Sequence, residues 1–517
     1  MALSLVICAG GLALGIAQHA GSLKREEHPK LSVSTCTASG CISQEKEVVI
    51  DQNWRWVHKR GQPVNCYTGN QWDTSICPDP KTCAANCEVG AADTEYASTY
   101  GVTTNGDELK MGFVTQGAYS KNVGSRNFLM DDESTYYMFK LKNKEFTFDV
   151  DVSKLPCGLN GAVYFVEMDA DGGMAKNPTN KAGAKYGTGY CDAQCPQDVK
   201  FINGEGNVVN WTATGPGTGV GQYGACCTEM DVWEANSIST AYTAHSCTTD
   251  GHRRCEGDDC GNTAGSRYKG LCDKNGCDLQ TYRLGNTTFF GKGGVIDTLQ
   301  KVTVVTQFIT EDGTDSGDLK EIRRHYVQNG KKIGTPELTV GSNQFDSIST
   351  EFCEAEAGLF KDHTNFLQKG GLKKMGEAME KGMVLVLSLW DDHEANMLWL
   401  DSTYPAGCTG PGCARGPCPT DSGKPGDVEN NAPDAAVTFS NIRFGDIGTT
   451  DGPEPPAPPA PPSPPGPPAP APSGSGKCCW GGCSSASCKT DWCGQSEARC
   501  TGDCSGEWCP SDASVLV

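Results

Sequence analysis

Strict alternation of apolar and polar residues is the clearest pattern in the first 450 positions of this chain. Residues 146–152 read F-T-F-D-V-D-V, and residues 302–304 repeat the same order. Side chains of a strand point alternately to its two faces, so the pattern predicts strands with one buried and one wet face. A last strand is expected to start at residues 437–439, shortly before the composition of the chain changes.

Two segments depart from this alternation. Residues 384–390 read as apolar throughout, which predicts a strand covered on both faces. Helical spacing is rare, and Leu372, Met375 and Met379 mark one short amphipathic helix. Many strands, Gly-rich turns and few helices predict an all-β sandwich or jelly roll.

The ends of the chain differ in composition from its middle. A short apolar run predicts a secretory signal peptide over residues 1–17, although no basic residue precedes it. Residues 449–476 are rich in Pro, Ala and Ser, which predicts an extended, polyproline-type linker. Residues 477–517 hold eight cysteines, and a unit this short needs disulfides because it buries little surface. We therefore expect a large domain over residues 18–448, a stiff tether and a small disulfide-rich module.

Cysteine content and net charge narrow the class of protein. Of the 29 cysteines, Cys8 lies in the signal peptide and the other 28 form an even number, as expected for disulfides in an oxidising compartment. A net charge of −20 argues against nucleic acid or an anionic membrane as partner, because both attract basic patches. The sequons at Asn210 and Asn286 fit a secreted glycoprotein. We expect a soluble, extracellular monomer.

One short stretch concentrates chemically active residues. Glu229, Asp231 and Glu234 follow a double cysteine, and His245 comes soon after. Paired carboxylates flanking a bond are what glycoside hydrolysis requires, because one donates a proton while the other attacks or activates water. A solvated acidic strand is the competing interpretation. Glu234 has the opposite strand parity from Glu229 and Asp231, so a bulge or bend after Asp231 is required to bring all three into one groove.

The double cysteine should fix this acidic stretch in place. Adjacent Cys226 and Cys227 point to opposite sides of an extended chain, so each should bond to a different partner. Zinc ligation by the twenty cysteines between Cys36 and Cys418 is disfavoured because CxxC pairs are missing there. A metal site built from the acidic residues and His245 is an alternative that chelation would test. We expect no metal and no cofactor.

Several longer motifs resemble family 7 glycoside hydrolases, the cellobiohydrolases and endoglucanases of fungi and some other eukaryotes. Besides the acidic stretch, these motifs are residues 53–56, 158–164, 185–192, 282–286 and 388–392. The resemblance extends from about residue 23 to residue 447. It implies a concanavalin-like β-jelly roll whose long loops enclose a substrate groove or tunnel. It also implies a retaining cellulase that cleaves β-1,4-glucosidic bonds and binds cellulose and cello-oligosaccharides.

The same resemblance implies roles for individual residues. Glu229 would be the nucleophile and Glu234 the acid/base, whose pKa should be raised by anionic neighbours and partial burial. Asp231 would hold the nucleophile, and His245 would lie beside the acid/base. Platform tryptophans, which bind the apolar faces of glucose rings, would be Trp56, Trp390 and Trp399. Further substrate contacts would be Asn160, Tyr164, Asp192, Gln194, Lys200, Arg126, Arg267, Arg283 and Arg415.

Loop lengths favour a cellobiohydrolase over an endoglucanase, because endoglucanases of this family shorten the loops over the groove. The resemblance itself implies action from reducing chain ends. The retained loops are residues 210–225, 255–272 and 346–370. Ala264 and Glu394 stand where related cellobiohydrolases pair tyrosines over the roof, so the tunnel should open more readily. An endoglucanase with a more open groove and a lectin-like cellulose-binding protein are the alternatives.

Other positions depart from the family pattern. Cys408 and Cys413 are an extra pair that should staple a loop near the product end. Gly21 and Glu88 replace the two cysteines of a common family disulfide. The tail does not match the fungal cellulose-binding module. Two interpretations stay open for the tail tryptophans. They would form either a flat strip that binds cellulose or the small core of a disulfide knot; these residues are Trp480, Trp492 and Trp508.

Overall fold

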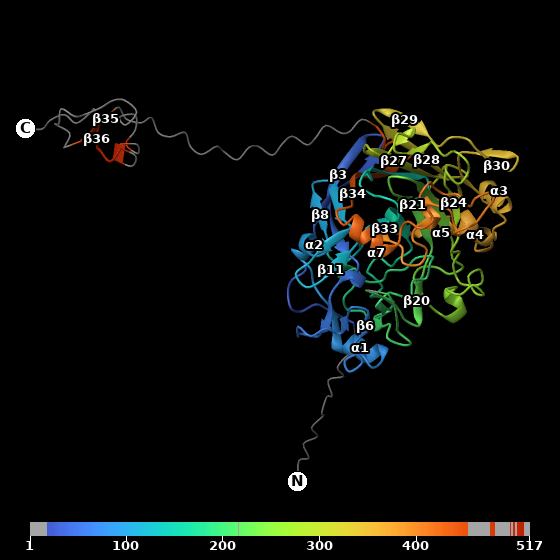
Figure 1. The fold of residues 1–517 in the computed structure, drawn as a ribbon, viewed down its shortest axis with the longest axis horizontal. Coiled ribbons are helices and arrows are strands. Elements are labelled where there is room, and N and C mark those ends of the chain that lie inside the picture. The colour runs from blue at the N-terminus through green and yellow to red at the C-terminus, as the bar shows by residue number, and fades with distance from the viewer. Residues whose placement is uncertain are drawn as a thin grey trace, which may run out of the picture. The chain divides into compact units, whose positions relative to one another are not determined.

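Strands are the main regular elements of the larger of the two units into which the chain divides, Met1–Pro453 and Glu454–Val517 (Figure 1). The computed structural model describes residues 18–215, 217–452, 476–480, 497, 500–501 and 504–510. The predicted signal peptide and most of the predicted linker therefore lie outside the described residues. In the larger unit, strands from both ends of the chain join one hydrogen-bonded network.

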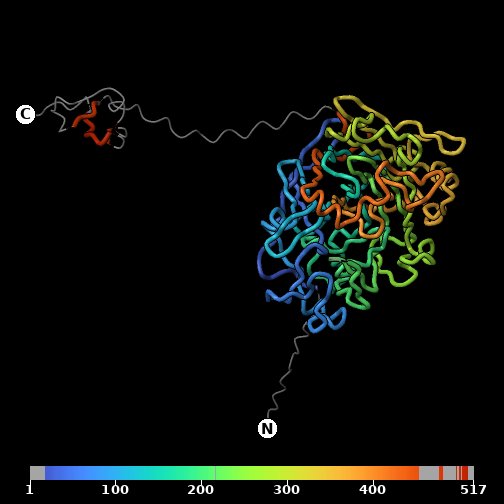
Figure 2. The backbone as a smooth tube through the Cα atoms, in the orientation of Figure 1, coloured from blue at the N-terminus to red at the C-terminus, as the bar shows by residue number. Residues whose placement is uncertain are grey.

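One layer of the larger unit is built around β33 (Met383–Asp391), an apolar strand buried on both faces as predicted. It inserts, from late in the chain, between β12 (Ser125–Met130) and β15 (Leu159–Val166) (Figure 2). β15 pairs with β21 (Glu229–Ala235), which pairs with β22 (Thr240–His245). The predicted catalytic carboxylates thus lie on an interior strand of this layer.

The second layer centres on β14 (Lys144–Asp151), which pairs antiparallel with β27 (Val302–Thr310) and β34 (Ala436–Asp446). Its aromatic side chains pack against the first layer, and the ring centroids of Phe146 and Phe165 lie 4.9 Å apart. The hydrophobic core fills the space between the two layers. The predicted β sandwich is confirmed.

The polar face of β14 is buried, so the prediction of a wet face is wrong. Thr147 and Asp149 are almost fully enclosed. The hydroxyl of Thr147 contacts that of Thr450, and Asp149 accepts a hydrogen bond from Thr303 at 2.6 Å. Later parts of the chain cover this face. Alternation reports the polarity of a face and carries no information about what covers it.

Smaller elements surround the two layers. The longer flanking strands are β2 (Lys30–Thr37), β3 (Gly40–Ile50), β9 (Glu108–Gly112), β28 (Leu319–Gln328) and β29 (Lys331–Gly334). The short strands of the larger unit are β1 (His19–Ala20), β4 (Val57–Lys59), β5 (Tyr67–Thr68), β6 (Gln71–Trp72), β7 (Cys87–Val89), β8 (Val102–Asn105), β10 (Val114–Gln116), β11 (Lys121–Val123), β13 (Met138–Phe139), β16 (Phe201–Ile202), β17 (Glu205–Gly206), β18 (Thr212–Gly215), β19 (Thr218–Val220), β20 (Tyr223–Cys226), β23 (Arg253–Glu256), β24 (Cys277–Leu279), β25 (Phe290–Gly291), β26 (Ile296–Asp297), β30 (Leu338–Val340), β31 (Asn343–Phe345) and β32 (Ser347–Ser349).

Helices are short and few, as predicted. Those of the described residues are α1 (Pro80–Asn86), α2 (Glu95–Ser98), α3 (Thr350–Phe360), α4 (Asn365–Gln368), α5 (Gly371–Lys381), α6 (Leu398–Asp401) and α7 (Pro425–Asn431), with 3-10 turns η1 (Gln52–Trp54), η2 (Ala184–Tyr186) and η3 (Gly257–Cys260). α5 confirms the predicted amphipathic helix and buries Leu372, Met375 and Met379. Among the described residues, no helix combines the length and apolar character needed to cross a bilayer.

Ten disulfides use all twenty cysteines between Cys36 and Cys418. Cys226 bonds to Cys195 and Cys227 bonds to Cys191, so the adjacent cysteines reach two different partners as predicted. The predicted extra pair also forms. The other disulfides are Cys36–Cys41, Cys66–Cys87, Cys77–Cys83, Cys157–Cys418, Cys247–Cys272, Cys255–Cys260, Cys277–Cys353 and Cys408–Cys413.

The larger unit extends slightly past the boundary predicted after Gly448. Thr450 is fully buried, and both its backbone N–H and its hydroxyl donate hydrogen bonds to the Glu145 carboxylate, at 2.7 and 2.8 Å. The Asp451 carboxylate lies 2.8 Å from His325 Nε2. These residues are therefore part of the sandwich, and a linker can begin only after them.

The second unit is described in part. β35 (Gly476–Cys479) pairs antiparallel with β36 (Glu507–Pro510), and Cys478 is bonded to Cys500. The half-buried indole of Trp480 donates a hydrogen bond to the carbonyl of Cys504 at 3.0 Å. Trp508 is also half-buried, whereas Trp492 lies outside the described residues.

Both predicted sequons lie in the larger unit. The Asn210 side chain is exposed and Asn286 is partly exposed, so both positions are open to solvent. Glycosylation of either one stays a prediction.

Candidate active site

A β-bulge bends β21 between Asp231 and Glu234. Against β22, the register shifts between these two residues. Against β15, Trp233 pairs with Val163 and Asp231 pairs with Tyr164, so Val232 is the extra residue. One extra residue exchanges the faces to which all later side chains of the strand point. This exchange brings Glu234 to the same face as Glu229. The predicted bulge is confirmed.

Glu229 and Asp231 lie close together on the face of β21 opposite the core residues Met230 and Val232. One donor atom from each, together with one from His245, forms a group within 4.8 Å. Glu229 accepts a hydrogen bond from the backbone N–H of Ala193 at 2.9 Å. This bond favours the ionised carboxylate of Glu229.

Glu234 is half-buried and held by Asn160. The Asn160 amide donates to Glu234 Oε1 at 2.9 Å, and its carbonyl oxygen accepts from the backbone N–H of Ala235 at 3.0 Å. Asn160 was predicted as a substrate contact, but its side chain is fully buried. Asn160 thus positions Glu234, because β15 directs its side chain under the bulge, and a contact with substrate stays a prediction.

Burial and mutual repulsion raise the pKa values of both glutamates. For Glu234, burial and then the charge of Asp231 hold the pKa well above the usual range, while the charge of His245 opposes them. For Glu229, burial and the charges of Asp231 and Asp192 act in the same direction. Since each carboxylate also raises the pKa of its neighbours, the group retains a proton where isolated glutamates would be ionised.

His245 is fixed by contacts on both ring nitrogens. Its Nε2 lies 3.2 Å from Asp231 Oδ2, and its Nδ1 lies 2.9 Å from the carbonyl oxygen of Asp273. Burial lowers the pKa of His245, but the hydrogen bond and charge of Asp231 outweigh it and raise the value to about 9. The ring is therefore a cation at neutral pH. Its direct partner is Asp231, and it acts on Glu234 through its charge.

A chain of hydroxyls connects the predicted contacts Tyr164 and Asp192. The hydroxyls of Tyr164 and Tyr190 lie 2.8 Å apart, and Tyr190 donates to Asp192 Oδ2 at 2.6 Å. The backbone N–H of Gln194 donates to Asp192 Oδ1 at 2.7 Å. Tyr190 was not predicted as a site residue, although it lies within the motif 185–192 that was noted.

Two predicted cationic contacts, Arg126 and Lys200, are also held by hydrogen bonds within the protein. The guanidinium of Arg126 donates to Asp51 at 2.8 Å and lies 3.3 Å from the ring centroid of Tyr190. Lys200 donates from its Nζ to the carbonyl of Asn53 at 2.5 Å. Burial lowers the pKa of Lys200 to about 8.

The predicted platform tryptophans lie in two places. Trp390 and Trp399 stack with ring centroids 6.2 Å apart and planes 28° from parallel. Asp392 accepts a hydrogen bond from the Trp399 indole at 2.9 Å. Trp56 is 41% exposed, and its indole donates to Asn65 at 2.7 Å. An exposed, hydrogen-bonded indole is a suitable surface for a sugar ring.

Two of the three remaining predicted arginines lie beside buried carboxylates, and the third binds an asparagine. Arg283 contacts Asp278 and, at 2.9 Å, Glu356, so its guanidinium is used within the protein. Arg415 lies 3.6 Å from Asp278 and its Nε has no partner among the described residues. Arg267 binds the side-chain oxygen of Asn275 at 2.7 and 2.9 Å. Arg283 is therefore a supporting residue, whereas Arg415 keeps an unused donor.

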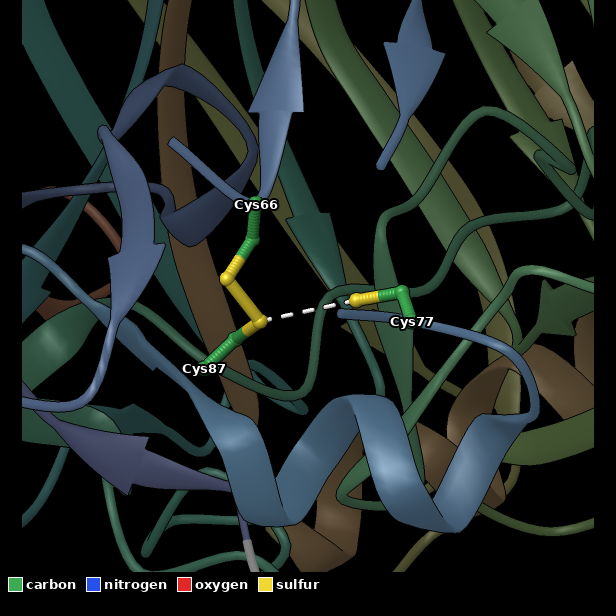
Figure 3. Close-up of side chains that lie close together, drawn as sticks. All are labelled: Cys66, Cys77 and Cys87. Carbon is green, nitrogen blue, oxygen red and sulfur yellow. Dashed lines mark hydrogen bonds between the residues drawn. A yellow bond between two sulfur atoms is a disulfide. The ribbon is translucent and has the colours of Figure 1, made fainter. Parts of the chain in front are cut away.

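Several acidic, histidine and cysteine groups have spacings that metals accept. Glu229, Asp231 and His245 form one such group, but a ring that is cationic at neutral pH opposes a metal ion there. Cys66, Cys77 and Cys87 form another, with Cys77 Sγ 3.4 Å from Cys87 Sγ (Figure 3). All three already belong to disulfides and offer no thiolate.

Comparisons with known proteins agree on one family. The family model described as "Glycosyl hydrolase family 7" matches residues 20–450 of this chain. A GH7 family cellobiohydrolase from Daphnia pulex is 53% identical, with a TM-score of 0.82 over 84% of this chain and 100% of that one. A cellobiohydrolase from Melanocarpus albomyces, complexed with cellotetraose, is 47% identical, with a TM-score of 0.79 over 84% and 99%. An endocellulase of Humicola insolens is 36% identical, with a TM-score of 0.70 over 84% and 100%.

Proposed function

Because the chain belongs to glycosyl hydrolase family 7, we propose that it is a secreted cellulase that hydrolyses β-1,4-glucosidic bonds with retention and releases mainly cellobiose from reducing chain ends. The observation that carries this proposal is the bulge in β21, which brings Glu229, Asp231 and Glu234 to one face. Two carboxylates with separate hydrogen-bond partners can take separate roles, and retaining hydrolysis needs such a pair.

The reaction uses the two glutamates in turn. The Glu229 carboxylate attacks the anomeric carbon while Glu234 gives its proton to the leaving glycosidic oxygen, forming a glycosyl ester. Glu234 then accepts a proton from the water that attacks the same carbon, and the ester bond to Glu229 breaks. The Ala193 N–H favours the ionised form of Glu229 against the opposing effects of burial and of the Asp231 charge, and His245 holds Asp231 in place.

The higher sequence identity to cellobiohydrolases favours release of cellobiose from chain ends over internal cleavage. The two cellobiohydrolases described above are 53% and 47% identical to this chain, whereas the endocellulase is 36% identical. The loops over residues 210–225, 255–272 and 346–370 are retained in the sequence. Product analysis on crystalline cellulose tests this assignment: cellobiose should predominate. Rapid loss of viscosity in a soluble cellulose derivative would contradict it and favour the endoglucanase alternative.

The second unit is proposed to hold the enzyme on cellulose. A Pro-rich tether keeps a bound catalytic domain close to its substrate and raises its local concentration. Removing residues 453–517 should weaken adsorption to crystalline cellulose and leave turnover of soluble cello-oligosaccharides unchanged. Equal adsorption with and without these residues would contradict this role.

The variant Glu229→Gln tests the proposed nucleophile. It should lower turnover by at least about a thousandfold, because the amide cannot form the glycosyl ester, while cello-oligosaccharide binding stays close to the parental value. Glu145→Gln is the matched control, since Glu145 is equally buried but lies on β14 in the other layer. Turnover at the parental rate in Glu229→Gln would contradict the assignment.

A further inference from the structure

A further group of potential metal ligands lies outside the catalytic strand β21, at the end of β33. Asp391 is the last residue of β33, His393 follows in the predicted roof region, and Glu429 comes from α7 (Figure 1). One donor atom from each residue forms a group within 4.8 Å. None of the three has a part in the proposed reaction.

Asp391 is buried without a full set of partners. Its side chain is 5% exposed, and its Oδ2 has no hydrogen-bond partner among the described residues. Its other oxygen, Oδ1, lies 3.8 Å from His393 Nε2, which is beyond hydrogen-bond distance. Burying a carboxylate in this state is costly unless a cation or proton compensates it.

Glu429 adds a second acidic group to the same place. Its side chain is 12% exposed, and Lys121 contacts its Oε2. This ammonium contacts Glu429, and among the described residues no lysine or arginine forms an ion pair with Asp391. His393 is more open, with 37% of its side chain exposed, so an ion has a path from solvent to the group.

We propose that Asp391, His393 and Glu429 bind a divalent transition-metal ion, with Zn²⁺ the best fit. An imidazole nitrogen with two carboxylate oxygens suits zinc, whereas Ca²⁺ and Mg²⁺ prefer oxygen ligands alone. Donors of a tetrahedral zinc site lie about 3.3 Å apart, given bond lengths near 2 Å. Rotation of the exposed His393 side chain can shorten the distances from its ring nitrogen to the two carboxylates.

The ion would connect two segments that are distant in the sequence. It would join the end of β33, with the residues after it that carry His393 and Glu394 in the predicted roof region, to α7. Asp392, between two of the ligands, accepts the hydrogen bonds that fix Trp399 and the backbone of residues 394, 395 and 397. Metal binding would therefore stabilise the roof segment and the adjacent tryptophan platform without entering the reaction.

Titration calorimetry with Zn²⁺ on the chelator-treated full chain tests this site. The measurement is made in the Glu229→Gln background, which removes one donor of the catalytic group. One site should remain in that background, and His393→Ala and Asp391→Asn should each weaken it at least tenfold. His393 is exposed, so its variant should fold even if Asp391→Asn does not. His363→Ala, which removes another exposed histidine, should leave the affinity unchanged.

The outcomes separate the site from its alternatives. Absence of Zn²⁺ binding, or equal affinity after His393→Ala, would overturn the proposal. Equally tight binding of Ca²⁺ would overturn the choice of a transition metal. Because calorimetry does not depend on turnover, a failure here leaves the proposed cellulase function untouched, and the reverse also holds.

Discussion

Around Glu234, single neighbouring residues act on the proton in opposite directions. Asp231 raises the pKa of Glu234, and the cationic His245 lowers it. The acid must keep its proton until the leaving oxygen takes it, so this pKa sets the alkaline limb of the pH–rate profile. The pH profile is therefore the most sensitive readout of the residues around the acid.

The variant His245→Gln should move the alkaline limb of kcat/KM upward by about one pH unit, because the opposing charge is gone. Asp231→Asn should move it downward, since Asp231 has the larger influence. That shift is partly offset because the Asp231 charge also keeps His245 protonated. Profiles measured on a soluble aryl cellobioside check both signs. An upward shift in both variants would contradict the arrangement.

The side chains that build the site could be predicted from the sequence, but the backbone groups that hold them could not. Glu229, Asp231 and Glu234 could be identified by type and spacing, and strand parity required the bulge. The backbone N–H of Ala193 and the carbonyl of Asp273 also hold the site. Any residue supplies these atoms, so the sequence carries no signal for them.

At the scale of elements, β15 supports the bulged strand through one side chain. Asn160 satisfies both Glu234 and the backbone N–H of Ala235. The resemblance marked Asn160 as part of the site, but it did not show these two hydrogen bonds, because a motif does not show which way a side chain points.

The variant Asn160→Ala should lower the free energy of unfolding by about 1–3 kcal/mol, because it leaves the buried Ala235 N–H unpaired. kcat should fall more than KM changes, since the buried Asn160 side chain acts through its hydrogen bond to Glu234. Urea unfolding and steady-state kinetics measure the two effects. A large increase in KM with kcat unchanged would show that Asn160 binds substrate after all.

The segment that carries Trp56 depends on a buried ion pair. Arg55 binds both oxygens of Glu26, at 2.8 and 2.9 Å, and both side chains are fully enclosed. Burial raises the pKa of Glu26, but the charge of Arg55 and the hydrogen bonds outweigh it and lower the value to about 2. The pair therefore contributes stability above pH 4.5 and loses it as the pH falls toward 2.

The variant Glu26→Gln should lower the free energy of unfolding by about 3 kcal/mol at pH 7, because Arg55 is left buried without a counter-charge. The difference from the parent should shrink at pH 3, where Glu26 begins to take up its proton. Denaturant unfolding at the two pH values tests this. A difference that grows on acidification would contradict the depressed pKa.

At the scale of the whole molecule, the end of the sandwich is set by tertiary contacts. The change in composition after Gly448 suggested the boundary, yet Thr450 is buried against Glu145. Composition marks where a chain stops supplying apolar residues. It cannot show that polar residues such as Thr450 and Asp451 are still packed, for the same reason that the covered face of β14 was missed.

Two truncated chains test this boundary. A chain ending at residue 448 should melt at a lower temperature than one ending at residue 452, because it exposes Glu145 and removes the ion pair of His325 with Asp451. Both should hydrolyse soluble substrates at the parental rate at moderate temperature, since the contacts lie in the layer opposite the carboxylates. Equal melting temperatures would show that residues 449–452 add nothing.

The assignment of Glu229 as the residue that bonds to the sugar can be tested directly by trapping. A 2-fluoro cellobioside with a good leaving group slows hydrolysis of the glycosyl ester, and mass spectrometry of peptides then locates the bound sugar. We expect the label on Glu229, with none in Glu229→Gln. A label on Asp231 or Glu234 in the parent protein would contradict the account.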